Sequence, residues 1–159
     1  MRIEWANLDD PALQEFLQAH LDDIAPTAPD ESQHALTTDA MRTSPGFRLW
    51  VAHLDDDVVG TVGLGPVSAG HEELKSMRTS PHRRGSGIGR ALLDHALTDA
   101  ATRGVRRVSL ETGSMEFFAP ARALYSRAGF RECGPFGAYP TDDPNSTFMT
   151  MELDRKTVE

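Results

Sequence analysis

The 159-residue sequence predicts a mixed α/β (α+β) fold with a central, mostly antiparallel sheet of about seven strands. Residues 87–103 form a long amphipathic helix between two apolar segments, the pattern of a βαβ crossover. Residues 47–54 and 58–64 are apolar segments separated only by an acidic turn, which is typical of an antiparallel hairpin. No internal repeat or linker divides the chain, so we expect a single domain over residues 1–159. The predicted element order is β-α-α-β-β-β-α-β-α-β-β.

One strand and two helices are expected before the hairpin. Residues 2–6 are predicted to form the strand. Asp10 can cap the first helix, Pro11 suits its first position, and apolar residues follow at helical spacing until Pro26. The second helix is predicted over residues 30–41, before the break at Ser44-Pro45-Gly46.

The remaining strands and helices follow from turn residues. Gly65-Pro66 is expected to end the hairpin, and a third strand to cover residues 72–79. Gly104 closes the long helix, and Pro120 and Gly129 bound a shorter one. The predicted C-terminal elements are a strand at 105–112, a helix at 119–128 and strands at 130–133 and 147–153.

The composition excludes several classes of protein. The net charge of −8 argues against a nucleic-acid-binding surface, which needs basic residues to displace counterions. No apolar run approaches the roughly 20 residues that span a bilayer. The N-terminus lacks the apolar region of a signal peptide, so we expect a cytoplasmic protein with no membrane partner. The single cysteine, Cys133, and the spacing of the six histidines indicate no metal site.

A glycine-rich, basic loop opens directly into the long helix. It reads Arg83-Arg84-Gly85-Ser86-Gly87-Ile88-Gly89-Arg90. Alternate glycines let main-chain N–H groups approach a bulky anion, and a helix N-terminus adds partial positive charge. The loop therefore predicts a pyrophosphate site.

Two other glycine motifs fit less well. A P-loop requires a Lys-Ser or Lys-Thr pair, and none follows here. The dinucleotide fingerprint G-x-G-x-x-G would need glycine at Arg90, although Glu111 lies where a ribose-binding acid would stand. In addition, residues 80–84 separate the loop from the preceding strand, whereas the dinucleotide turn is immediate.

These residues resemble those of a known family. Arg84-x-x-Gly87-x-Gly89 is similar to the R/Q-x-x-G-x-G/A signature of the GCN5-related N-acetyltransferases (the GNAT superfamily). The segment from Ala121 to Phe130, which contains Leu124-Tyr125 and Gly129-Phe130, resembles that family's A-x-x-L-Y-x-x-x-G-F motif. The element order matches over essentially the whole chain, which implies a GNAT-like sheet with helices on both faces.

The resemblance implies acetyl-CoA as acyl donor, a small-molecule amine as acceptor, and a homodimer, which is frequent in this family. The implied coenzyme-binding residues are Met77, Arg78, Thr79, Arg84, Gly85, Ser86, Gly87, Ile88, Gly89 and Arg90. Main-chain groups of Met77 and Thr79 would pair with the pantetheine arm, in a gap between the strands ending at Thr79 and Thr112. Acceptor contacts are expected from the first two helices and from the segment around Phe136 to Tyr139. Two alternatives stay open: a catalytically silent CoA-binding module and an unrelated phosphate-ligand enzyme.

The resemblance also implies the catalytic residues. Tyr125 matches the tyrosine that protonates the leaving sulfur, and a phenol with a pKa near 10 can donate at neutral pH. Glu73 matches the position of a glutamate base in some members, with Glu72 as its rival because neighbouring strand residues face opposite ways. The oxyanion donor is expected to be a main-chain N–H near Met77. One departure is Phe118, where many members have asparagine.

The strand pattern carries one further hypothesis. In a regular strand Glu73, Lys75 and Met77 share a face. Lys75 would then face the reacting amine and attract an acceptor carboxylate.

Overall fold

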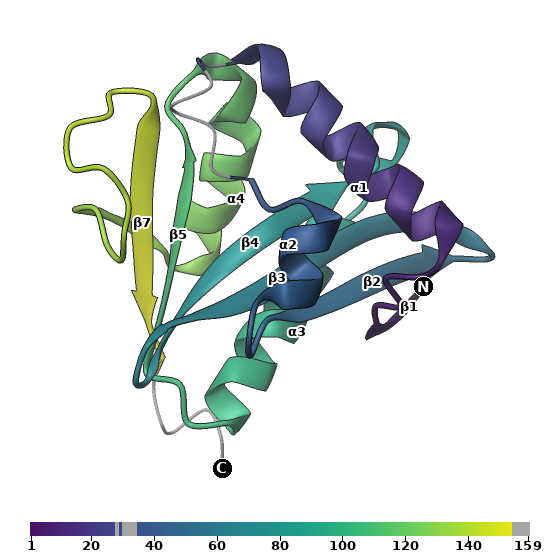
Figure 1. The fold of residues 1–159 in the computed structure, drawn as a ribbon, viewed down its shortest axis with the longest axis horizontal. Coiled ribbons are helices and arrows are strands. Elements are labelled where there is room, and N and C mark those ends of the chain that lie inside the picture. The colour runs from purple at the N-terminus through teal and green to yellow at the C-terminus, as the bar shows by residue number, and fades with distance from the viewer. Residues whose placement is uncertain (28, 30–34, 154–159) are drawn as a thin grey trace.

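The computed structural model describes residues 1–27, 29 and 35–153 (Figure 1). In this part of the chain seven strands and four α-helices follow one another in the predicted order, which is confirmed. The elements are β1 Arg2–Trp5, α1 Pro11–Ile24, α2 Thr38–Thr43, β2 Arg48–Leu54, β3 Asp57–Ser68, β4 His71–Thr79, α3 Ile88–Thr102, β5 Arg107–Gly113, α4 Ala119–Ala128, β6 Arg131–Cys133 and β7 Ser146–Glu152.

The strands form one mostly antiparallel sheet, as predicted. Their order across the sheet is β1-β2-β3-β4-β5-β7-β6. Only β4 and β5 pair in parallel among the described strands, and α3 is the crossover between them. A parallel pair needs such a crossover because the chain must return to the same end of the sheet.

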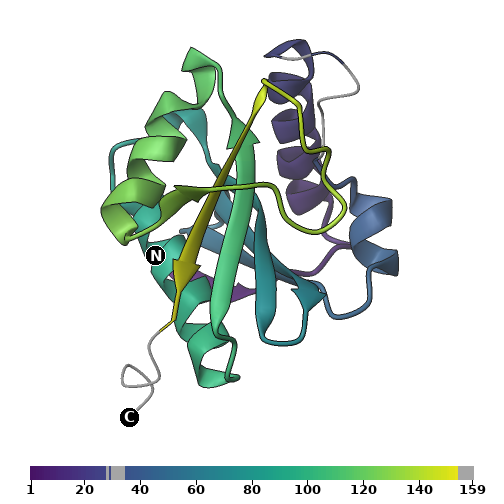
Figure 2. The ribbon, with the colours of Figure 1, turned by 90° about the vertical axis from the view of Figure 1, so that its left-hand side faces the viewer.

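Helices cover both faces of the sheet, and each face has its own hydrophobic cluster (Figure 2). Alternation along β2 supplies both clusters: Trp50 packs with the α3 and α4 face, whereas Leu49 and Val51 pack with the α1 and α2 face. On the α3 face Leu92 and Leu93 are completely buried. The burial of each side chain contributes about 1.5–3 kcal/mol to the free energy of unfolding. Within the described residues, no helix combines the length and the apolar character needed to cross a membrane.

The parallel strands β4 and β5 part halfway along their length. They pair from His71 with Arg107 as far as Leu74 with Leu110, and beyond that point β5 continues to pair only with β7 (Figure 1). The second half of β4 therefore keeps its hydrogen bonds to β3 while its other edge faces a gap in the sheet.

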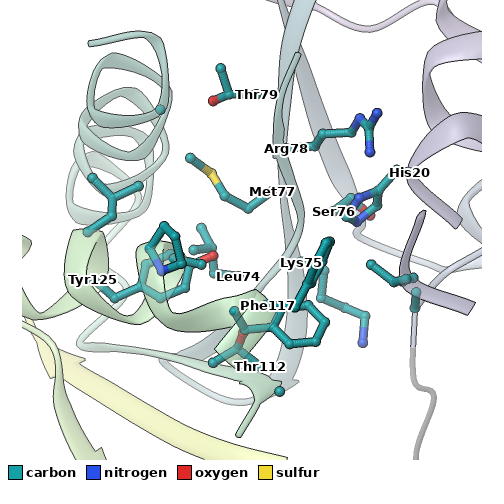
Figure 3. A pocket seen from close by; sticks show the side chains of 18 of the residues that line it. His20, Leu74, Lys75, Ser76, Met77, Arg78, Thr79, Thr112, Phe117 and Tyr125 are labelled. Atoms are coloured by element: carbon teal, nitrogen blue, oxygen red, sulfur yellow. The ribbon is translucent and has the colours of Figure 1, made fainter. Parts of the chain in front are cut away.

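A β-bulge at Ser76 changes which way the second half of β4 faces. Lys75 pairs with Gly63 and Arg78 with Thr61, so three steps on β4 match two on β3. Ser76 has a φ of 54°, and its carbonyl accepts a 2.7 Å hydrogen bond from the Thr61 hydroxyl. Figure 3 shows the result: Met77 and Thr79 point toward α3 and α4, and Arg78 points toward His20 on α1. The prediction that Met77 shares a face with Glu73 and Lys75 is wrong, because the extra residue inverts the alternation.

Two predicted boundaries also differ from the structure. β3 runs through Gly65-Pro66 to Ser68; β2 pairs with it only as far as Leu64, so Pro66 lies where β3 is an edge strand, a position that tolerates proline. The second helix begins only at Thr38, where the Thr37 hydroxyl accepts a hydrogen bond from the Ala40 N–H. Residues 30–34, predicted to begin that helix, lie outside the described residues.

Candidate active site

A cavity of about 640 Å3 opens where β4 and β5 part. Two groups of residues line it, and they come from opposite faces of the sheet (Figure 3). What we call the loop side comprises Thr79, Arg84, Gly85, Gly87, Gly89, Arg90, Leu124 and Tyr125. What we call the α1 side comprises His20, Asp23, Glu73, Lys75, Arg78 and Tyr139. The cavity thus brings together residues predicted to bind the coenzyme and residues predicted to contact the acceptor.

The glycine loop presents open backbone to the cavity. Gly85 and Gly87 have φ values of 82° and 85°, and an added Cβ would meet nothing within 4 Å at either position. Gly87 immediately precedes α3, and in the described structure no side chain caps that helix. The first N–H groups of α3 are therefore available to an anion. Gly89 acts differently: its Cβ would lie 3.2 Å from Thr79 Oγ1 and 3.3 Å from Leu124 Cδ2, so the lack of a side chain allows close packing.

The side chains of the loop are engaged to different degrees. Arg90 Nε lies 3.0 Å from Asp94 Oδ1, and Arg83 lies 4.0 Å from Asp57. Arg84 lines the cavity without a carboxylate in ion-pair distance among the described residues. Ser86, although predicted to bind the coenzyme, is not part of the described cavity wall, and its hydroxyl donates to the Arg83 carbonyl.

Tyr125 reaches the cavity from the middle of α4. Its side chain is buried, with its ring 5.8 Å from that of Phe130. Burial raises the pKa of Tyr125, so the phenol stays protonated at neutral pH. Across the described residues, no side chain or carbonyl accepts a hydrogen bond from this hydroxyl, which therefore has a proton to donate.

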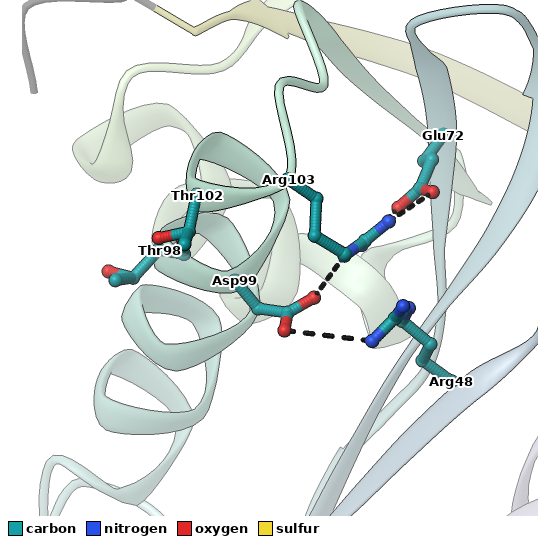
Figure 4. Close-up of polar contacts among 6 residues, drawn as sticks. All are labelled: Arg48, Glu72, Thr98, Asp99, Thr102 and Arg103. Carbon is teal, nitrogen blue, oxygen red and sulfur yellow. Dashed lines mark hydrogen bonds and ion pairs between the residues drawn. The ribbon is translucent and has the colours of Figure 1, made fainter. Parts of the chain in front are cut away.

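Glu72 and Glu73 face opposite sides of the sheet. Both oxygens of Glu72 accept hydrogen bonds from Arg103, at 2.7 and 2.8 Å, and Arg103 also binds Asp99 (Figure 4). Glu72 thus ties β4 to the end of α3, away from the cavity. The Glu73 side chain lines the cavity and is 14% exposed. Of the two glutamates, only Glu73 is therefore positioned to serve as the predicted base in the cavity.

Glu73 belongs to a cluster with Lys75 and Tyr139. Glu73 Oε2 accepts hydrogen bonds from Lys75 Nζ at 3.2 Å and from the Tyr139 hydroxyl. Lys75 Nζ also donates to the Tyr139 hydroxyl at 2.9 Å. Burial, followed by the nearby Glu73 carboxylate, raises the pKa of Tyr139, so its proton stays on the phenol. No described residue donates to Glu73 Oε1, which leaves that oxygen available to a bound molecule.

Aromatic packing fixes Tyr139 in this position. Its ring lies 5.3 Å from that of Phe136 and 5.4 Å from that of Phe148. The resemblance led us to expect Tyr139 in an acceptor-binding segment but indicated no partner for it. No local signal could have supplied one, since the contact with Glu73 joins residues 66 positions apart.

Arg78 lies on the α1 side, although it was predicted among coenzyme-binding residues. Its Nη1 donates to Asp23 Oδ2 at 2.9 Å, and its guanidinium lies over the Phe16 ring at 5.2 Å. Beside it, His20 is held neutral: burial first, then the charge of Arg78, lowers its pKa to about 4. Sequence reasoning missed His20 and Asp23 because neither belongs to a motif.

Phe118, which stands where many members of the resembled family have asparagine, packs tightly at the end of β5. A Cβ at Gly113 would lie 2.1 Å from the Phe118 ring, so glycine is required beneath it. Arg122 secures the same turn by donating to the carbonyls of Gly113 and Met115 at 2.7 and 2.9 Å. This wall of the cavity is thus apolar where an amide would otherwise stand.

Known proteins share this sequence pattern and fold. The sequence profile of the Acetyltransferase (GNAT) family matches residues 11–130. The chain is 39% identical over 153 residues to the uncharacterized N-acetyltransferase YsnE of Bacillus subtilis, covering 96% of this chain and 100% of the relative. It is 36% identical over 149 residues to the IAA acetyltransferase of Azospirillum brasilense, covering 92% and 93%.

Solved structures of acyltransferases share the fold of this chain. The crystal structure of a Klebsiella pneumoniae protein assigned to the acyl-CoA N-acyltransferases by similarity superposes with a TM-score of 0.75 at 25% identity, covering 96% of this chain and 97% of the other. An aminoglycoside 6'-N-acetyltransferase complexed with coenzyme A shares the fold, with a TM-score of 0.71 at 19% identity and coverage of 96% and 97%. The family match, the full-length relatives and the shared fold lead to one conclusion: this chain is an acyltransferase of the GNAT family.

Proposed function

We propose that this enzyme transfers the acetyl group of acetyl-CoA to the amine of a small-molecule acceptor, by direct attack in a ternary complex. The observation that supports this most directly is the single cavity that joins the glycine loop and Tyr125 to the Glu73 carboxylate. Acetyl-CoA supplies an activated thioester, and the protein then needs to bind the donor, accept a proton and donate one.

The loop side has the features of a donor site. The open backbone at Gly85 and Gly87, the N-terminus of α3 and the Arg84 side chain suit a pyrophosphate. The edge of β4 that faces the gap carries main-chain groups of Met77 and Thr79, which suit an extended pantetheine arm added like a strand.

Glu73 and Tyr125 provide the two proton transfers. Glu73 Oε1 takes the proton from the acceptor ammonium, directly or through a water, because Oε2 is occupied by Lys75 and Tyr139. The freed amine forms the new C–N bond at the acyl carbon as the C–S bond breaks. Tyr125 gives its proton to the departing sulfur, and the proton lost by the new amide nitrogen restores the phenol. A main-chain N–H in the segment around Met77, next to the bulge at Ser76, would stabilise the oxyanion.

The test is thiol release from acetyl-CoA with a broad panel of amines. We expect turnover with at least one amine class, and a rise in melting temperature with acetyl-CoA. Binding of acetyl-CoA without release across the panel would indicate the catalytically silent module. Preference for nucleotides over coenzyme A would indicate the unrelated phosphate-ligand enzyme.

Gly87→Glu tests the donor site within the same experiment. The carboxylate would occupy the anion site, so the acetyl-CoA-dependent shift in melting temperature should disappear. Gly104→Glu is a matched control, because Gly104 has a φ of 84° and equally open space but follows the other end of α3. An equal shift for the two folded variants would contradict the assignment of the loop.

A further inference from the structure

We propose that the amine acceptor carries a carboxylate and that Arg78 binds this group on the α1 side of the cavity. The inference rests on the proposed function and deepens it, since it names the acceptor's chemical class and the residue that selects it.

The Ser76 bulge places Arg78 in the acceptor half. In a regular strand Arg78 would point to the same face as Leu74, toward the hydrophobic cluster beneath α3. The extra residue moves it to the face that bears Glu73 and Lys75, and its guanidinium points toward His20 (Figure 3). The base and the buried guanidinium therefore line one wall of the cavity.

Arg78 has unused hydrogen-bonding capacity. Its side chain is 6% exposed, and its only carboxylate partner in the described chain is Asp23, which contacts Nη1. The buried Nε has no hydrogen-bond partner among residues 1–27, 29 and 35–153. A guanidinium offers paired N–H groups that match a carboxylate, and a buried donor without a partner is unfavourable until something binds it. An acceptor carboxylate would satisfy it.

The other charged groups of this wall already have partners. Lys75, which the sequence favoured for this role, pairs with Glu73 on the same strand. Glu111 accepts a 2.6 Å hydrogen bond from Ser146. His20 is neutral above a pH of about 4 and adds no competing charge beside Arg78. Among the described charged residues of the α1 side, Arg78 is thus the cation whose donors exceed its partners.

The experiment compares amino acids with their carboxamides, which keep the shape and remove the charge. We would use one α-amino acid pair and one ω-amino acid pair as acceptors. For at least one pair we expect kcat/KM for the acid to exceed that for the amide about tenfold or more. In Arg78→Met this ratio should fall toward one, because kcat/KM for the acid decreases while that for the amide changes little. Arg78→Lys keeps the charge and should retain part of the ratio. Arg107→Met, which removes the same charge outside the cavity, should leave the ratio unchanged.

Two measurements keep the inference testable. Calorimetry of acid and amide binding in the presence of coenzyme A reports on Arg78 without turnover, so failure of catalysis is distinguishable from failure of recognition. If Arg78→Met does not fold, the acid-to-amide ratio of kcat/KM is compared between Arg78→Lys and the wild type instead. Equal or better use and binding of every amide by the wild type, or equal loss for acid and amide in a folded Arg78 variant, would overturn the proposal.

Discussion

The Tyr139 hydroxyl donates a hydrogen bond to Oε2 of Glu73, joining the loop between β6 and β7 to the first half of β4. Lys75 donates to the same oxygen from two residues along the strand. One oxygen of Glu73 is thereby held by two donors, which fixes the orientation of this cavity-lining carboxylate.

Tyr139→Phe should lower kcat about tenfold with little change in KM for acetyl-CoA, since one hydrogen bond to a charged group is lost. Steady-state kinetics with a saturating amine would measure this. Phe136→Leu is the control, because it disturbs the same aromatic packing without contacting Glu73. An equal loss in both variants would mean that Tyr139 only stabilises the loop.

Tyr125→Phe should slow the chemical step by tenfold or more, since general acid catalysis typically contributes about 10²–10⁴. The ring and its contact with Phe130 remain, so stability should change little. Single-turnover rates are the appropriate measurement, because slow product release can mask the defect in kcat. An unchanged single-turnover rate would leave Tyr125 a packing residue only.

The adjacent glutamates should separate stability from catalysis. Glu72→Gln weakens the paired contact with Arg103 and should cost about 1–2 kcal/mol in the free energy of unfolding. Its kcat should remain near that of the wild type. Glu73→Gln should lower kcat at least tenfold and keep acetyl-CoA binding. Denaturant unfolding and kinetics on both variants would decide, and the reverse pattern would assign the base to Glu72.

His20 should make the protein less stable in acid. Its pKa is about 4 in the folded state, against 6.5 ordinarily, because it is buried beside Arg78. Below pH 6.5 the unfolded chain takes up a proton that the folded protein resists, so stability falls until about pH 4, by at most about 3 kcal/mol. His20→Gln should show a shallower decline in urea unfolding between pH 7.5 and 4.5. If stability falls equally steeply with pH in the wild type and in His20→Gln, the folded protein takes up a proton at His20 as readily as the unfolded chain does.

Features with local causes were predictable from the sequence. The helix Ala119–Ala128 was predicted to the residue, because Pro120 and Gly129 fix its two ends. The glycine loop was recognisable for the same reason: its spacing and the helix that follows it are contiguous in sequence.

Features that depend on a neighbouring strand were not predictable. The Ser76 bulge arises from the pairing of β4 with β3, and nothing in the segment Lys75-Ser76-Met77 specifies an extra residue. Without it, strand alternation would direct Arg78 toward the hydrophobic cluster beneath α3 rather than toward His20. The start of α2 at Thr38 has a local signal in the Thr37 N-cap, which the prediction overlooked, and Met41 packs the helix against α1 and β2.

The separate hydrophobic clusters have an evolutionary consequence. Leu13 and Leu17 of α1 pack in one cluster, and Ile88 and Leu92 behind the glycine loop pack in the other, with no buried residue in common. Substitutions in α1 can therefore reshape one wall of the cavity while leaving the support of the loop intact, because distant changes in separate clusters add independently. After gene duplication, one copy could diverge toward a new acceptor through α1 alone, while its capacity to use the original donor is inherited unchanged.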